Sequence, residues 1–209
     1  MRKRLIALVA PIVLISSCAD GVSITPPGGP HPSTSASTWL LYQGSPSAQP
    51  YRLAPGEQGP PSLVASGTFL PFRPGSTAIT YDPVVVPPGA RARVAVTETT
   101  HGTVVRLTAA GFIPRRAYGA HLHTRPCTAV PDEAGPHYQH RHDPSYANPR
   151  NEVWLDFTAD ATGAGTAVSE LDWTFGPADP PRSLVIHAEP TSATGKAGPR
   201  VACLTLPPA

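Results

Sequence analysis

Proline and glycine are spread so densely through the chain that only short elements of secondary structure fit between them. The 209 residues include 28 prolines and 18 glycines, more than a fifth of the total. Proline removes a backbone donor from a helix interior, and glycine carries an entropic cost there. The chain therefore favours short strands joined by turns over long helices, and its length suggests one main domain with appendages.

From about residue 76 onward, β-rich segments alternate with turn signals such as PPG and HGT. Almost no helical periodicity accompanies them, which predicts an all-β antiparallel sandwich or barrel over residues 76–209. About eight strands are expected, at 78–86, 90–99, 103–112, 120–123, 152–160, 167–175, 183–189 and 200–206. The proline-rich stretch 124–150 is then one long loop, and such loops are usually functional or disordered.

The first eighteen residues are typical of a bacterial export signal. A basic start (residues 2–4) precedes an apolar run (residues 5–15) that is too short to span a bilayer. The following ISSC resembles a lipobox, in which Cys18 is lipidated and becomes the mature N-terminus; plain secretion is the alternative. We expect the protein in the cell envelope, lipid-anchored to the outer face of the cytoplasmic membrane, or secreted.

Two segments separate this signal from the predicted domain. Residues 19–38 are rich in Pro, Ser, Thr and Gly and indicate a flexible tether. Residues 39–75 contain two candidate strands separated by proline-rich sequence, so we treat them as an extension of uncertain structure.

The charge balance is mild. Only 14% of residues are charged and the net charge is +2, which argues against nucleic acid or an anionic membrane surface as the main partner.

The chain has three cysteines. If Cys18 carries lipid, Cys127 and Cys203 remain, and outside the cytoplasm they most simply pair. Two unpaired buried thiols are the alternative. A bridge would close a loop of about 75 residues and stabilise the fold by about 4 kcal/mol in the chain-entropy model.

Histidines are concentrated in one part of the chain. In GAHLH, strand alternation would place His121 and His123 on one face and Leu122 on the other. Two adjacent imidazoles can bind one metal ion, and imidazole suits copper and zinc; a structural or surface pair is the alternative. Five of the eight histidines lie within residues 121–142, which favours the metal site.

A sixth histidine, His187, lies in SLVIHAE. Alternation would place Leu184 and Ile186 on one face of this strand and His187 on the other. A bridge between Cys127 and Cys203 would bring this strand towards the HxH pair.

Five ordered segments resemble the copper,zinc superoxide dismutase family. They are GAHLH (119–123), AGPHYQ (134–139), FTADATGAG (157–165), SLVIHAE (183–189) and KAGPRVACLTL (196–206). The similarity spans roughly residues 78–206. It implies a Greek-key β-barrel or sandwich with long metal-binding loops, and an enzyme that converts superoxide into oxygen and hydrogen peroxide.

The resemblance also implies a role for each matched residue. His121, His123 and His187 would ligate copper throughout the cycle. His137 would be the fourth ligand, the one that releases Cu(I) and carries a proton. Arg200 would guide the superoxide anion to the copper, since a fixed cation attracts a small anion. The family's intrasubunit disulfide would join Cys127 and Cys203.

The chain departs from the family where zinc would bind. After His137, the next histidines follow within five residues, at His140 and His142, and none lies between His142 and His187. Where the zinc aspartate is expected, Glu152 is the nearest acid.

Two further departures concern aspartates. Asp156 comes slightly late for the zinc position. The loop 188–199 is short for the family and lacks the aspartate that links the copper and zinc ligands.

These losses favour a copper-only variant, in which Glu152 orients the free nitrogen of His137. In one alternative, zinc is held by a set drawn from His137, His140 or His142, Asp143 and Glu152. In the other, HRHD (140–143) is a solvated polar turn.

Three functions are compatible with the sequence. The main hypothesis is an extracytoplasmic superoxide dismutase. The second is a non-catalytic copper-binding lipoprotein for storage or delivery, and the third is an adhesive sandwich without metal. Arg200 favours the enzyme, because a carrier has no need of an anion-guiding cation beside the metal.

Overall fold

The structure is a computed structural model that describes residues 60–208. The predicted lipidation site Cys18, the tether 19–38 and most of the extension 39–75 lie outside the described residues. Within 60–208, no helix is long and apolar enough to cross a membrane.

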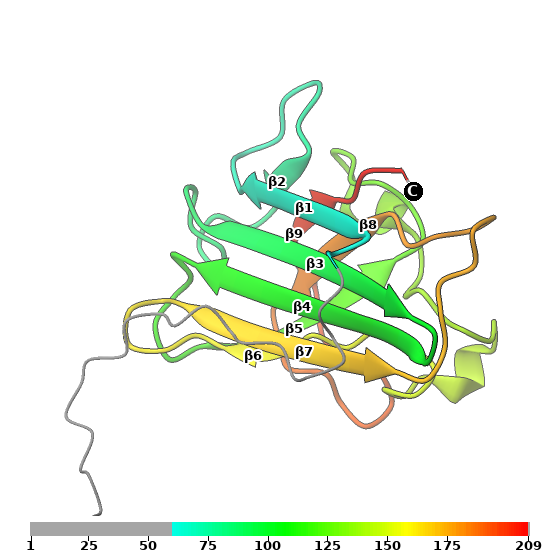
Figure 1. Cartoon of the computed structure of the whole chain (residues 1–209). Coiled ribbons are helices and arrows are strands. Elements are labelled where there is room, and N and C mark those ends of the chain that lie inside the picture. The colour runs from blue at the N-terminus through cyan, green and yellow to red at the C-terminus, as the bar shows by residue number, and fades with distance from the viewer. Residues whose placement is uncertain (1–59, 209) are drawn as a thin grey trace, which may run out of the picture. The chain divides into compact units, whose positions relative to one another are not determined.

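Two antiparallel sheets face one another in the described part of the chain (Figure 1). One has four strands in the order β1-β3-β4-β7, and the other has five in the order β2-β9-β8-β5-β6. The strands are β1 (Leu63–Thr68), β2 (Ala78–Thr80), β3 (Arg91–Thr99), β4 (Gly102–Ala110), β5 (Ala117–His123), β6 (Phe157–Thr158), β7 (Gly165–Leu171), β8 (Ser183–His187) and β9 (Arg200–Thr205). This arrangement confirms the predicted all-β sandwich of antiparallel strands.

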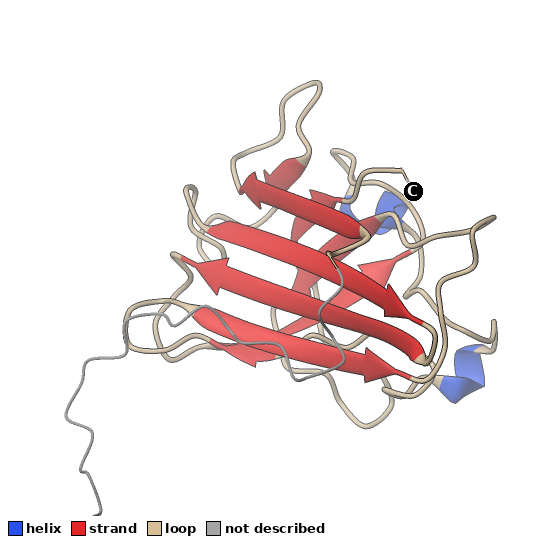
Figure 2. Cartoon of the chain, viewed as in Figure 1, coloured by secondary structure: helices blue, strands red, loops and turns tan. Residues whose placement is uncertain are grey.

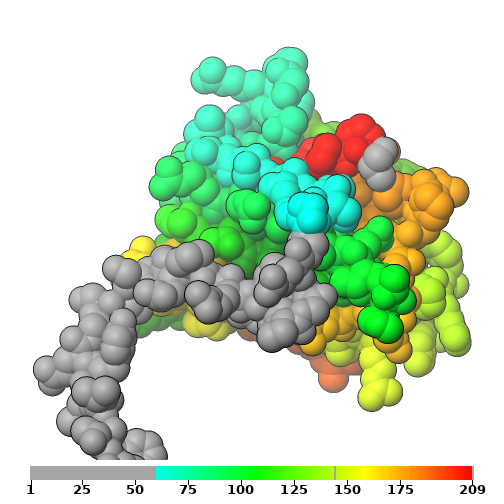
Figure 3. Space-filling model, viewed as in Figure 1, coloured from blue at the N-terminus to red at the C-terminus, as the bar shows by residue number. Residues whose placement is uncertain are grey.

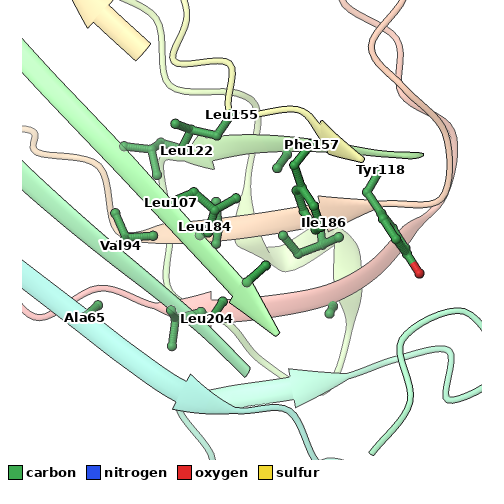
Figure 4. Close-up of a cluster of buried hydrophobic side chains, with 14 of the residues drawn as sticks. Ala65, Val94, Leu107, Tyr118, Leu122, Leu155, Phe157, Leu184, Ile186 and Leu204 are labelled. Atoms are coloured by element: carbon green, nitrogen blue, oxygen red, sulfur yellow. The ribbon is translucent and has the colours of Figure 1, made fainter. Parts of the chain in front are cut away.

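The core lies between the sheets and follows from strand alternation. In β5, Tyr118 and Leu122 are fully buried in it, and in β8 the same is true of Leu184 and Ile186 (Figure 4). Burying one such side chain stabilises the fold by roughly 1.5–3 kcal/mol, which fixes the register of both strands. The histidines of β5 and β8 therefore lie on the opposite face of the five-stranded sheet.

The sandwich begins earlier in the chain than the predicted boundary at residue 76. Strand β1 pairs with β3 from Leu63↔Val96 to Thr68↔Arg91, and it lies at the surface, in cyan in Figure 3. Gly67 makes this possible, because a Cβ there would lie 2.5 Å from the Cβ of Ala78. The prolines that weakened this prediction flank the strand and do not interrupt it.

The segment 152–160 differs from its prediction as a continuous strand. Within this segment, only β6 pairs regularly with β5. Glu152 forms an isolated bridge to Gln139, and Trp154 forms one to His121. This irregular backbone passes beside the histidine face.

The long loop 124–150 is shaped by two short 3₁₀ helices, blue in Figure 2, and by a disulfide. The helices are η1 (Pro131–Ala134) and η2 (Pro144–Tyr146). The expected disulfide joins Cys127 of this loop to Cys203 of β9, with Cα atoms 5.7 Å apart. The loop is thereby tied to the five-stranded sheet.

Candidate metal centre

Four histidines meet on the outer face of the five-stranded sheet. His121 and His123 come from β5, and His187 ends β8, where it pairs with Gly119. His137 arrives from the long loop, because Tyr138 N–H donates to the Leu122 carbonyl at 2.8 Å. One ring nitrogen from each histidine lies within 4.8 Å of the others.

Two of these imidazoles are oriented by backbone carbonyls. His123 Nδ1 lies 2.9 Å from the Gly135 oxygen, and His187 Nδ1 lies 3.1 Å from the Gly198 oxygen. A carbonyl only accepts, so each Nδ1 carries the proton and each Nε2 keeps a lone pair. The two Nε2 atoms are 3.5 Å apart. Two lone pairs at this separation repel each other, and a cation between them removes the conflict.

His137 is oriented by Glu152. The Nδ1–H of His137 donates to Oε2 at 2.8 Å, and the same carboxylate accepts from Gln139 and Trp154, both at 2.8 Å. Burial raises the pKa of Glu152, but the hydrogen bonds from these three side chains outweigh burial and leave its pKa lowered. The buried carboxylate thus stays ionised and leaves Nε2 of His137 as the nitrogen able to bind a metal.

His121 shows most clearly that the residues fit a metal. Its Nε2 lies 2.7 Å from Thr191 Oγ1, while its buried Nδ1 has no hydrogen-bond partner within the described residues. A buried polar atom without a partner is costly, and a ligated cation would supply the missing interaction. Nitrogen donors of this kind suit copper and zinc.

Three imidazoles of the cluster are also neutral, as metal ligands must be. Burial, followed by the neighbouring histidines, lowers the pKa of His121. Burial likewise lowers the pKa of His123 well below its usual value and that of His187 to about 4. These three imidazoles therefore keep their lone pairs at neutral pH.

Arg200 lies beside the cluster in a fixed conformation. Its guanidinium donates to the Pro131 carbonyl at 3.0 Å and to the Gly135 carbonyl at 2.7 Å. Asp132 approaches at 3.8 Å, but its side chain is 93% exposed, so this pair is weak. Gly135 has a φ of 79°, and a Cβ there would lie 2.4 Å from Thr124 Oγ1, so the turn requires glycine.

The residues proposed for zinc are only partly brought together, because His137 and Glu152 are hydrogen-bonded while His140 and Asp143 make other contacts. The exposed ring of His140 stacks on Trp173 with centroids 4.8 Å apart, and Asp143 caps η2 by accepting from Ser145 N–H. His142 lines one pocket with His137 and Glu152, but the four-histidine group is the only potential metal cluster among residues 60–208. Residues 140–143 are exposed in the described structure.

The sequence reasoning missed three side chains that organise the cluster, namely Thr191, Gln139 and Trp154. Gln139 faces Glu152 across an isolated bridge, and Trp154 follows Glu152 by two residues in the same irregular segment, which no periodicity marks. Thr191 lies in the loop 188–199, where no motif marks it.

No protein-family model matches the chain, and no curated protein matches it. Among solved structures, the chain is similar to a Cu/Zn superoxide dismutase from Brucella abortus, with 20% sequence identity and a TM-score of 0.47. The match covers 69% of this chain and 97% of that one.

Proposed function

We propose that the chain is an extracytoplasmic superoxide dismutase that uses copper and no zinc. The observation that carries the proposal is the set of four imidazoles, each with one nitrogen free for a common metal ion, beside a fixed guanidinium. Copper would supply the one-electron redox chemistry by which superoxide is converted into oxygen and hydrogen peroxide.

The protein groups have separate tasks in this proposal. The buried His121, His123 and His187 hold the metal in a rigid frame. His137 is the most exposed of the four. Its Nε2 would hold a proton, to be passed to product, only while that nitrogen is not bound to the metal, and Glu152 keeps the ring in place through Nδ1. Arg200 attracts the anion and orients it.

The preference for copper alone is supported by Glu152. In a site that shares a histidine between two metals, both ring nitrogens of that histidine are occupied by metal. Here Nδ1 of His137 is hydrogen-bonded to a buried carboxylate that two other side chains also contact. A second ion at Nδ1 of His137 would have to displace this hydrogen bond to Glu152.

The extracytoplasmic location is supported by the disulfide, since such bonds persist in oxidising compartments. Anchoring by lipid at Cys18 remains part of the proposal and is tested by metabolic labelling with a radioactive fatty acid. Wild type is expected to incorporate label, and Cys18→Ala is expected to lose it.

The enzymatic proposal is tested with the full-length, disulfide-bonded protein loaded with copper. Superoxide decay is recorded by stopped-flow absorbance for wild type, His123→Ala and the control His101→Ala, whose histidine lies in the exposed β3–β4 turn. Fast decay in wild type and the control, lost in His123→Ala, supports the enzyme. Copper binding without faster decay in wild type would instead support a copper carrier.

A further inference from the structure

A threonine and an aspartate form a hydrogen-bonded chain behind His121. The Nε2 of His121 lies 2.7 Å from Thr191 Oγ1, and that hydroxyl lies 2.7 Å from Oδ1 of Asp156. Neither residue lies close to His121 in the sequence. Asp156 follows the irregular segment before β6, and Thr191 belongs to the loop after β8.

The direction of each hydrogen bond follows from the donors available. A carboxylate only accepts, so the single proton of the Thr191 hydroxyl points to Asp156. The hydroxyl oxygen then offers only lone pairs to His121, and Nε2 of His121 must be the donor. The neutral ring has one N–H, which leaves Nδ1 unprotonated.

Backbone contacts keep the aspartate in place. Its Oδ2 accepts from Thr191 N–H at 2.6 Å, and its Oδ1 also accepts from Ala120 N–H at 3.1 Å. The carboxylate therefore joins β5 directly to the loop that supplies the hydroxyl. Rotation of the carboxylate would break several of these contacts at once.

Close packing of the loop on β5 depends on Gly119. A Cβ at this position would lie 2.6 Å from both the Glu189 carbonyl oxygen and the Ala197 Cβ, and 3.2 Å from Thr191 Oγ1. The glycine thus lets the loop approach β5 closely enough for Thr191 to reach the ring of His121.

We propose that Thr191 and Asp156 are positioning residues that fix the tautomer of His121 and so present its Nδ1 lone pair to the metal. The inference deepens the proposed function and rests on it for the identity of the metal. The proposed role explains why Nδ1 is the free nitrogen of His121. In the other three histidines the pattern is reversed, with Nδ1 hydrogen-bonded and Nε2 free. The proposed role also gives the short loop 188–199 an orienting function without an aspartate of its own.

The tautomer is measured first in the metal-free, full-length protein. Long-range ¹⁵N–¹H correlation spectra of the histidine rings distinguish protonated from unprotonated nitrogens, and His121 is assigned by comparison with His121→Gln. Wild type is expected to show His121 protonated at Nε2 alone. Protonation at Nδ1 would overturn the inference, whatever metal the protein binds and whether or not any variant folds.

The second measurement compares Thr191→Val, which removes the hydroxyl at similar volume, with Thr191→Ser, which keeps it. Copper affinity, from competition with a chelator, is expected to fall about 10- to 100-fold in the valine variant and to stay near wild type in the serine variant. The Cu(II) electron paramagnetic resonance spectrum is expected to change only in the valine variant.

The outcomes separate this inference from the proposed function. Equal copper affinity and equal spectra in all three proteins would overturn the role of the hydroxyl while leaving the copper site intact. If wild type bound no copper, the proposed function would fail, and the metal-free spectra would still decide whether Thr191 sets the tautomer.

Discussion

The guanidinium of Arg200 and the imidazole of His123 donate to the same carbonyl oxygen, that of Gly135, at 2.7 and 2.9 Å. The cation that would attract the substrate anion and one of the potential metal ligands are therefore positioned by a single peptide group. That group lies in the loop that the disulfide ties to β9. The arrangement couples the substrate-guiding charge to the metal ligands.

Arg200→Ala is expected to lower the rate of superoxide disproportionation roughly tenfold or more and to weaken its dependence on ionic strength. The reason is that a fixed positive charge raises the association rate of an anion, and salt screens this attraction. Rates are measured at several salt concentrations. The control is Arg93→Ala, which removes an exposed arginine from the four-stranded sheet. Equal losses in both variants would contradict a specific role for Arg200.

Glu152→Gln is expected to reduce copper affinity about 10- to 100-fold, because the residue that orients His137 loses its negative charge. Affinity is measured by chelator competition. The control Glu170→Gln changes an exposed acid on β7 and should leave affinity unchanged. An unchanged affinity in Glu152→Gln would show that His137 needs no carboxylate to hold its orientation.

Reducing the disulfide is expected to lower the free energy of unfolding by about 4 kcal/mol, since the bridge spans 76 residues and restricts the unfolded chain. Urea unfolding of the oxidised protein is compared with that of Cys127→Ala/Cys203→Ala. The double variant should also lose affinity for copper, because the loop carrying Gly135 and His137 is no longer tied to β9. A variant with unchanged stability and affinity would contradict both expectations.

The metal-free protein is expected to lose stability as the pH falls from about 6.5 to 4. His187 has a pKa of about 4 in the folded chain, while an unfolded histidine titrates near 6.5. Between these values the unfolded state binds more protons, so acid favours unfolding, by roughly 3 kcal/mol for this residue. The lowered pKa values of His121 and His123 act in the same direction. Urea unfolding at pH 7 and pH 4 measures the change, and constant stability would contradict it.

Much of the fold could be predicted because alternation is a local property. The pattern in GAHLH places Leu122 in the core and both histidines on the other face, and the structure has this arrangement. The same reasoning holds for Leu184, Ile186 and His187. Strand β1 was harder to predict because prolines surround it, and its pairing depends on the close approach at Gly67.

The surroundings of the histidines could not be predicted in the same way. The position of His137 is set by one backbone hydrogen bond from a long loop to β5, which no periodicity reveals. The contact from Asp156 through Thr191 to His121 joins residues up to 70 positions apart. His140 and His142 were candidate ligands only because histidines are concentrated in this part of the chain. In the structure the ring of His140 stacks on Trp173.

The central claim, a copper-only superoxide dismutase, is tested most directly by the metal content of the active protein. The full-length, disulfide-bonded protein is loaded with copper and zinc together, dialysed, and analysed by native mass spectrometry, with superoxide decay assayed on the same sample. The account predicts one copper, no zinc and fast decay. One bound zinc beside the copper, or copper without catalysis, would contradict it.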